Sequence, residues 1–386
     1  MVGGSLAGLS AANWLCATGW EVDILERACE PLVDRGAGIV LHPATSRFLT
    51  AQEGLALDDF SVAVDHLRYL GPDGSVVTER ESRFRFAAYG SLYRSLRRSL
   101  ERRGGRYVHG ARVTAVQTAG RTAHVALADG TGTSGQLLVG ADGVRSTVRR
   151  LILPDVEPEL GGYVAWRGVL DEDELPEHAL RPLERAITYT ILDHAHILTY
   201  PIQAADGRMR RNWVWYRNLT APGELEELLR DRDGERHELS VAAGAVRQQL
   251  VAALAAEADR ELPPPLATLV GRTATPFVQA MVDVTPPHLV VGRVCLLGDA
   301  GFVARPHAAA GTAKAAEEAW LLAQALSDPA VELEEALAGW ERGALDLGSA
   351  LVARSRRAGE RAQHEGSWNV GEPPPFGLRS TGDSEY

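Results

Sequence analysis

MVGGSLAGLSAANWL, residues 1–15, is the stretch that decides the fold of this chain. Gly3, Ser5 and Gly8 fit the glycine-rich turn of dinucleotide-binding domains, with Ser5 in place of the second glycine. Gly3 allows the tight turn, and Gly8 lets the following helix approach the preceding strand closely. The start of that helix offers free N–H groups and a positive dipole end to a pyrophosphate. The stretch therefore predicts a strand, a turn and a helix that hold a dinucleotide.

The composition is that of a globular protein, with 386 residues, 45% hydrophobic and 24% charged. A formal net charge of -11 argues against a nucleic-acid partner, which would require a basic face. Cys16, Cys29 and Cys295 are dispersed and odd in number, as expected for reduced thiols. No apolar run reaches the about 18 residues that cross a membrane. These features favour a cytoplasmic protein with no membrane partner.

An acidic residue supports the dinucleotide turn. Glu26 ends the strand-like stretch WEVDILER and lies 23 residues after Gly3, where a carboxylate can accept hydrogen bonds from ribose hydroxyls. We assign Arg27, the next residue, to the same cofactor site. The alternative is that Glu26 and Arg27 form only a solvated strand end.

Two further motifs deliver an aspartate from an apolar strand into a loop and a helix. VGADGVRSTVR, residues 139–149, contains Asp142, and LLGDAGFVARPHAAAG, residues 296–311, contains Gly298 and Asp299. Each aspartate can meet a second ribose, and the glycines let the backbone approach a cofactor. An aspartate at such a position is also a common helix cap, so either motif alone leaves both interpretations open.

The set of GGSLAG, GADGVRS and GDAGFVARP resembles the FAD-dependent aromatic hydroxylases, single-component flavoprotein monooxygenases with the para-hydroxybenzoate hydroxylase fold. The resemblance covers essentially the whole chain. It implies that Glu26 holds the adenosine ribose and that Arg94, in YRSL, approaches the FAD pyrophosphate. It also implies that Asp142 serves a motif shared by FAD and the nicotinamide cofactor, and that Asp299 contacts the ribityl chain. Pro306 and Gly311 then bound the loop that lines the flavin ring.

The same resemblance implies an α/β fold, in which a Rossmann-like FAD-binding domain of the GR2 type is interleaved with a mixed β-sheet substrate domain. We expect residues 1–160 to form the first FAD-binding segment, with a β-hairpin excursion at about 62–80. Residues 161–270 form the substrate-binding sheet, and residues 271–365 form the second FAD-binding segment with C-terminal helices. Residues 366–386 are a tail rich in proline and glycine.

Within the family, four stretches resemble the branch that hydroxylates dihydroxypyridines. They are GIVLHP, GYVAWRGVL, RPHAAAG and WNVGEPPPFGL. Most relatives carry a Pro-x-x-Gly-x-Gly loop where this chain has Pro306 to Gly311. This departure favours the branch, and it does not fix the substrate.

By resemblance, NADH or NADPH reduces FAD, and O2 then gives a flavin hydroperoxide that hydroxylates an electron-rich aromatic or N-heteroaromatic ring, here dihydroxypyridine-like. Such a ring must ionise, which requires a base or a cation near its oxygen. His307 and His42 are the candidate bases, and Arg167 is the candidate cation. Tyr200 and Trp215 are candidate walls of the substrate site. The plainer alternatives are a loop-fixing hydrogen bond for His307, a salt bridge for Arg167 and sheet core for Trp215.

The histidines show no metal-ligand spacing, and we predict no metal site. A hydroxylase or epoxidase of a larger natural product would share every cofactor motif. The helical C-terminal part is compatible with a homodimer and equally with packing on the FAD-binding domain.

The strand ahead of the glycine turn is short, because only Met1 and Val2 precede Gly3. Buried backbone groups that lack a partner cost about 1–3 kcal/mol each. We therefore expect a native start upstream of Met1, and the alternative is a flavin-binding protein that is inactive because its N-terminus is truncated.

Overall fold

The computed structural model describes residues 1–32 and 38–383. Its mainly parallel sheet is centred on Val2, which bridges in parallel to Leu25 on one side and to Gly140 on the other. The N–H of Val2 donates to the carbonyl oxygen of Val139 over 2.9 Å, and the N–H of Ala141 donates to the carbonyl oxygen of Val2 over 2.7 Å. The short segment ahead of the glycine turn thus makes backbone pairs on both sides. In order, the sheet contains β7 (Arg106–Val108), β1 (Asp23–Leu25), Val2, β11 (Leu138–Gly140), β19 (Val294–Leu296) and β18 (Val290–Val291).

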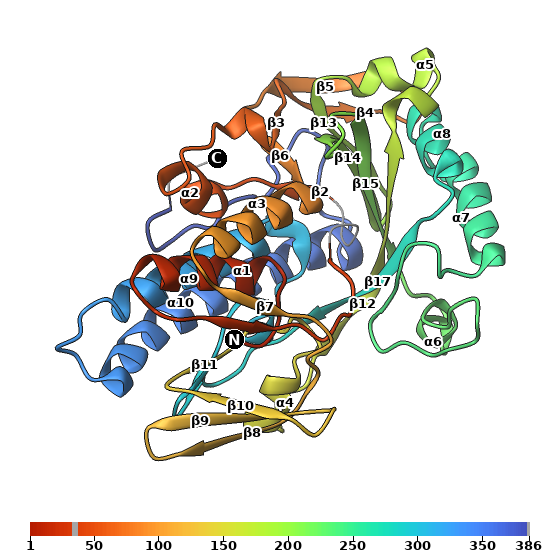
Figure 1. Ribbon diagram of the computed structural model, residues 1–386. Coiled ribbons are helices and arrows are strands. Elements are labelled where there is room, and N and C mark those ends of the chain that lie inside the picture. Colours follow the sequence, from red (N-terminus) through yellow and green to blue (C-terminus); the bar gives the residue numbers. More distant parts are fainter. Residues whose placement is uncertain (33–37, 384–386) are drawn as a thin grey trace.

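Helices cover this sheet in one layer, in which α1, α9 and α10 lie side by side (Figure 1). Ala11, Ala12, Ala319 and Ala323 are fully buried, so α1 and α9 pack closely through small side chains. Leu92, Leu96 and Leu100 recur along one face of α3, which packs against α1. The helices are α1 (Leu6–Ala17), α3 (Tyr89–Arg102), α9 (Gly311–Ala325) and α10 (Leu333–Gly359).

An eight-stranded mixed sheet forms the second large layer. It takes β4 and β5 from residues 66–81 and β17 from residues 277–283, in addition to the strands between residues 159 and 241. The β4–β5 pair is an antiparallel hairpin, and β4 runs parallel to β13. In order, the sheet contains β16 (Ser240–Val241), β17 (Phe277–Asp283), β12 (Glu159–Asp171), β15 (Met209–Asn218), β14 (Ala195–Gln203), β13 (Ala186–Leu192), β4 (His66–Leu70) and β5 (Val76–Glu81).

The two faces of this sheet follow the two-residue period of its strands. On β15, Trp213 and Trp215 belong to the core shared with α7 (Gln248–Glu261) and α8 (Pro264–Arg272). Val214 and Tyr216 point to the opposite face, which we call the inner face. Figure 1 shows α7 and α8 on the outer side of the strands.

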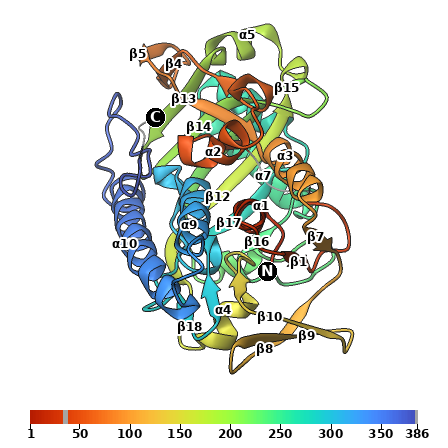
Figure 2. The same ribbon diagram turned by 60° about the vertical axis from the view of Figure 1, so that its left-hand side comes forward.

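A small antiparallel sheet lies beside the inner face. It consists of β2 (Gly38–Val40), β6 (Arg85–Ala88) and β3 (Val62–Ala63), and it contacts β14. Helix α2 (Pro43–Ala51) contacts α9, which in turn contacts α10, and Figure 2 shows the three helices close together. The remaining elements include α4 (Thr147–Ile152), α5 (Glu177–Leu180), α6 (Glu224–Leu228), β8 (Val113–Ala119), β9 (Thr122–Leu127) and β10 (Gly132–Gly135).

This arrangement confirms the predicted α/β class, with several sheets and a long C-terminal helix, α10. Across residues 1–32 and 38–383, none of the helices combines the length and the apolar character needed to cross a membrane.

Candidate functional site

One cavity, of about 640 Å³, joins the parallel sheet to the inner face of the eight-stranded sheet. We call it the central cavity. At one end it is lined by the glycine turn, the residues that follow β1 and β11, and the loop that follows β19. Its other end, the aromatic end, is lined by Arg167, Tyr200, Tyr216 and Phe376. The cavity therefore connects the three cofactor motifs with the middle sheet.

The glycine turn leaves no room for side chains. Gly3 has φ +96°, and a Cβ there would lie 2.4 Å from the carbonyl oxygen of Ala141. A Cβ on Gly4 would lie 2.1 Å from the hydroxyl of Tyr107, and one on Gly8 would lie 2.0 Å from the carbonyl oxygen of Gly3. Because these three glycines have no Cβ, the start of α1 can lie close against the sheet. The front of the turn stays open to the cavity.

The N-terminus of α1 faces the central cavity. In the described part of the chain, no side chain caps this helix, although Ser5 occupies the cap position. The hydroxyl of Ser5 instead forms a hydrogen bond of 2.7 Å with the hydroxyl of Tyr89. The positive end of the helix dipole is thus available to an anion in the cavity.

Glu26 is buried at the carboxyl end of β1 and lines the cavity. Its Oε2 accepts a hydrogen bond of 2.9 Å from the N–H of Gly4, and its Oε1 accepts one of 2.8 Å from the N–H of Ala28. Arg27 also lines the cavity. Glu26 therefore fixes the glycine turn while keeping acceptor lone pairs for a ligand.

Asp142 lines the cavity and also caps α4. Its carboxylate accepts hydrogen bonds from the N–H groups of Thr147 and Val148, at 2.7 and 3.2 Å, and from the hydroxyl of Ser146. The helix-cap interpretation of this motif is thus confirmed, and the position of Asp142 in the cavity wall leaves the cofactor role as a prediction. The buried guanidinium of Arg149, in the same motif, donates to the carbonyl oxygens of Asp299 and Ala300 and so joins two cofactor motifs.

Asp299 projects into the cavity from the loop after β19. Enclosure by the protein raises the pKa of its carboxyl, and the positive charges of Lys314 and Arg149 oppose this effect. Lys314 is the only lysine in the chain and is fully buried. Its Nζ donates to the carbonyl oxygen of Gly298 over 2.9 Å and to the carboxylate of Glu318 over 3.0 Å, and Glu318 accepts from the N–H of Gly298 over 2.8 Å. This buried ion pair holds both backbone groups of Gly298.

The loop from Pro306 to Gly311 borders the cavity through Pro306, Ala309 and Gly311. Ala309 has φ +52°, in the left-handed region that favours glycine. For a residue with a Cβ this conformation costs about 1–2 kcal/mol. The strained residue falls in the part of the loop where this chain departs from the common family pattern.

At the aromatic end, Arg167 projects from β12 with one donor unmatched. Its Nη1 donates to Gln279 over 3.2 Å, whereas its Nε is buried and has no hydrogen-bond partner among the described residues. Tyr200 donates its hydroxyl to the carbonyl oxygen of Gly38 over 2.8 Å. Burial raises the pKa of Tyr200 to about 12, against the opposing charge of Arg167. Burial also raises the pKa of Tyr216, so both tyrosines of this end stay protonated.

His307 is buried behind the cavity and is not among the residues that line it. Its Nε2 lies 2.6 Å from the hydroxyl of Tyr163, and its ring packs against Tyr216 and His196. Burial and the neighbouring charge of Arg305 lower the pKa of His307 to about 3, so the ring is neutral. Pro306 turns toward the cavity and His307 turns away, an arrangement that favours the loop-fixing role of His307 over a direct substrate contact.

His42 and Trp215 also lie away from the cavity. His42 caps α2, because its Nδ1 accepts from the N–H of Ala44 over 3.1 Å, and its Nε2 lies 2.9 Å from Asp383. Trp215 is fully buried on the outer side of the eight-stranded sheet. These placements favour structural roles for His42 and Trp215 over substrate contacts.

Three predicted cofactor residues do not line the cavity directly. Arg94 is half-buried on α3. Gly8 lies close against the backbone of Gly3, where a Cβ would not fit. Gly298 adopts a positive φ of +65°, and its carbonyl oxygen accepts a hydrogen bond from Lys314. The predicted residues that do line the cavity are Gly3, Ser5, Glu26, Arg27, Asp142, Arg167, Tyr200, Asp299, Pro306 and Gly311.

Two residues of the aromatic end were missed from the sequence. Tyr216 could have been found, because the alternation of NWVWYRN places it on the face opposite Trp215. Phe376 could not, because it lies in the tail, where no periodic pattern shows which side chains turn inward.

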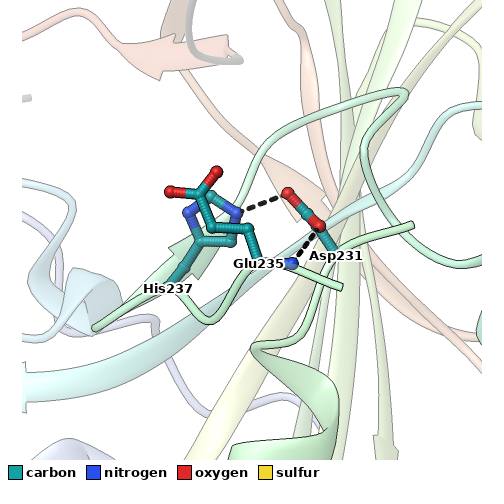
Figure 3. A group of neighbouring side chains, drawn as sticks. All are labelled: Asp231, Glu235 and His237. Carbon is teal, nitrogen blue, oxygen red and sulfur yellow. Dashed lines mark hydrogen bonds and ion pairs between the residues drawn. The ribbon is translucent and has the colours of Figure 1, made fainter. Parts of the chain in front are cut away.

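A separate polar group lies outside the cavity, on the loop before β16 (Figure 3). Asp231, Glu235 and His237 bring their side chains together there. One oxygen of Asp231 accepts from the N–H groups of Asp233 and Glu235 at 2.9 Å, and the other lies 2.8 Å from Nε2 of His237. Both oxygens thus stabilise a turn, and we assign the group no metal.

A glycine turn of the dinucleotide-binding type faces an arginine and two tyrosines across one cavity, an arrangement that suits an enzyme with a dinucleotide cofactor. A family model described as FAD binding domain-like matches residues 160–283. The chain belongs to the family of FAD-dependent aromatic monooxygenases. It is 34% identical over 383 residues to the 2,6-dihydroxypyridine 3-monooxygenase of Paenarthrobacter nicotinovorans, with 98% of this chain and 95% of the relative covered.

Solved structures agree with this assignment. That of 2,6-dihydroxypyridine-3-hydroxylase from Arthrobacter nicotinovorans has a TM-score of 0.91 at 33% identity, covering 100% of this chain and 96% of that one. That of Klebsiella pneumoniae HpxO complexed with FAD and uric acid has a TM-score of 0.77 at 25% identity, covering 94% of this chain and 88% of that one. The predicted family is therefore confirmed.

The buried ion pair predicts a large loss of stability on replacement of Lys314. Lys314→Met leaves the carboxylate of Glu318 buried without its cation, and such a change costs about 3–5 kcal/mol. The double variant Lys314→Met/Glu318→Leu should recover part of this loss. Urea unfolding measures both effects, and a single variant within about 1 kcal/mol of the parent would contradict the assignment.

The lowered pKa of the buried His307 ring makes the free energy of unfolding depend on pH. The unfolded ring binds a proton below its ordinary pKa of 6.5, whereas the folded ring does so only near 3. The fold therefore loses about 1.4 kcal/mol per pH unit as the pH falls from 6.5 toward 3. In urea unfolding between pH 6.5 and 4.5, the free energy of unfolding of His307→Asn should fall less steeply with pH than that of the parent. The control His178→Asn, at an exposed position, should show the same slope as the parent. Equal slopes for all three proteins would contradict the neutral, buried ring.

Proposed function

We propose that this chain uses NADH or NADPH and O2 to hydroxylate a small, electron-rich ring of the 2,6-dihydroxypyridine type. The observation that carries the proposal is the unmatched Nε of Arg167, a buried cationic donor in the wall of the aromatic end. A buried donor without a partner costs about 1–3 kcal/mol, and an anionic ring oxygen would satisfy it. The name of the relative that is 34% identical supports the choice of ring.

The residues of the central cavity fit FAD. Gly3 and Gly4 form a cradle that a Cβ would fill, and the uncapped start of α1 suits a pyrophosphate. We assign Glu26 to the adenosine ribose and Asp299 to the ribityl chain. Pro306 and Ala309 would border the flavin ring. When bound, FAD supplies the redox chemistry that activates O2.

The chain's own residues prepare the ring for reaction. The guanidinium of Arg167 would hold a ring oxygen and favour its ionised form, since a nearby positive charge lowers the pKa of an acidic group. The protonated hydroxyl of Tyr200 and the ring of Tyr216 would orient the substrate. The apolar side chains of Leu198 and Val214 in the same wall limit the access of water.

We predict that replacement of Arg167 lowers kcat/KM for the ring substrate. Oxidation of NADH or NADPH by the holoenzyme should rise with 2,6-dihydroxypyridine, and mass spectrometry should find a product heavier by one oxygen. Hydrogen bonds to charged groups contribute about 1.5–3 kcal/mol, so Arg167→Met should lower kcat/KM by about 10–150-fold. Arg167→Lys should retain part of the activity, and Arg98→Met, on the exposed face of α3, should match the parent.

A parent enzyme that converts neither 2,6-dihydroxypyridine nor simple phenols would contradict the proposed substrate class. A parent that converts the ring while Arg167→Met keeps full kcat/KM would contradict only the role of Arg167.

We predict that replacement of Asp299 lowers the affinity of the protein for FAD. Asp299→Ala removes a charged acceptor from the cavity wall, and Kd for FAD should rise by about 10–150-fold. Quenching of flavin fluorescence on titration of the apoprotein measures this value without turnover. Asp155→Ala, at an exposed position, is the matched control. An unchanged Kd for Asp299→Ala would show that the aspartate does not face the cofactor.

A further inference from the structure

The C-terminal tail, residues 366–383, contributes a wall to the central cavity. Phe376 is 8% exposed and lines the cavity together with Tyr200 and Tyr216. Its ring meets that of Phe84 edge to face, with 5.1 Å between the ring centroids. Figure 2 shows the tail as a dark blue loop that rises beyond the end of α10. A segment without helix or strand thus supplies an aromatic surface to the aromatic end.

The tail is fixed directly after Phe376. The N–H of Gly377 donates to the carbonyl oxygen of Ala308 over 3.2 Å, within the loop that borders the cavity. Arg354, on α10, donates to the carbonyl oxygen of Gly377. Leu378 is 1% exposed and packs in a cluster with Ala308, Ala310 and Leu351. The position of Phe376 is therefore coupled to that of the loop.

The tail is also fixed before Phe376. The hydroxyl of Tyr69, on β4, donates to the carbonyl oxygen of Glu372, and the carboxylate of Glu372 pairs with Arg361 over 2.8 Å. Pro373, Pro374 and Pro375 follow, and each proline restricts φ, so the chain loses less entropy when it holds this path. Anchors on both sides make Phe376 a rigid wall and not a freely moving side chain.

We propose that the tail closes the aromatic end and that Phe376 determines the size of the ring that the enzyme accepts. The proposal rests on the proposed function, because it concerns the same substrate. With Phe376 in place, the space beside Arg167 and Tyr216 is bounded on the tail side and suits a single ring. Removal of the phenyl group extends the cavity toward Phe84 and admits a second fused ring.

The test compares two substrates on the holoenzyme, the single ring 2,6-dihydroxypyridine and the fused bicycle 2,4-dihydroxyquinoline. Changes of this size in an apolar pocket alter discrimination by about 10–200-fold. Phe376→Ala should therefore raise the ratio of kcat/KM, bicycle over single ring, by at least about 10-fold. Titration of the bound-flavin absorption spectrum with each compound gives Kd values that should shift in the same direction without turnover.

Two variants keep the test decisive. Phe376→Leu preserves most of the packing and should shift the ratio in the same direction by a smaller factor, even if Phe376→Ala fails to fold. Val370→Ala, at an exposed position in the same tail, should keep the parent ratio. Folded Phe376 variants whose ratio stays within 2-fold of an active parent would overturn the role of Phe376 alone. A parent that hydroxylates neither compound would overturn the proposed function as well.

Discussion

The rest of the structure depends on one constraint, which is that the carboxyl ends of neighbouring parallel strands meet at one edge of a sheet. Val2, β1, β11 and β19 run parallel, so the residues that follow them converge. Those residues are Gly3, Glu26, Asp142 and Asp299, and all four line the central cavity. Segments far apart in sequence thus form one site, and Arg149 and Lys314 then hold the loops through backbone carbonyls.

The second constraint is the two-residue alternation of the eight-stranded sheet. It sends Trp213 and Trp215 outward to the helices and Tyr200 and Tyr216 inward to the cavity. One sheet can therefore serve as hydrophobic core on its outer face and as a binding wall on its inner face. From this sheet Arg167 extends its guanidinium to the cavity, and its buried Nε has no hydrogen-bond partner among the described residues.

The sequence allowed prediction of the fold class and of most cavity residues that follow strands, because glycine turns and strand-end carboxylates have fixed spacings. It could not place His307, because adjacent residues of a short turn can point either way, and Pro306 rather than His307 faces the cavity. The role of Lys314 was missed because a lysine inside a helix gives no sign of its burial until Glu318 and Gly298 are seen beside it. Phe376 was missed because a tail carries no periodicity.

The central claim is that one cavity holds FAD against the glycine turn and an aromatic substrate against Arg167. A crystal structure of the holoenzyme with 2,6-dihydroxypyridine tests it most directly. The account predicts the flavin ring beside Pro306 and a substrate oxygen within hydrogen-bond distance of Nε of Arg167. A substrate bound elsewhere, or a flavin that fills the aromatic end and leaves no space beside Arg167, would contradict it.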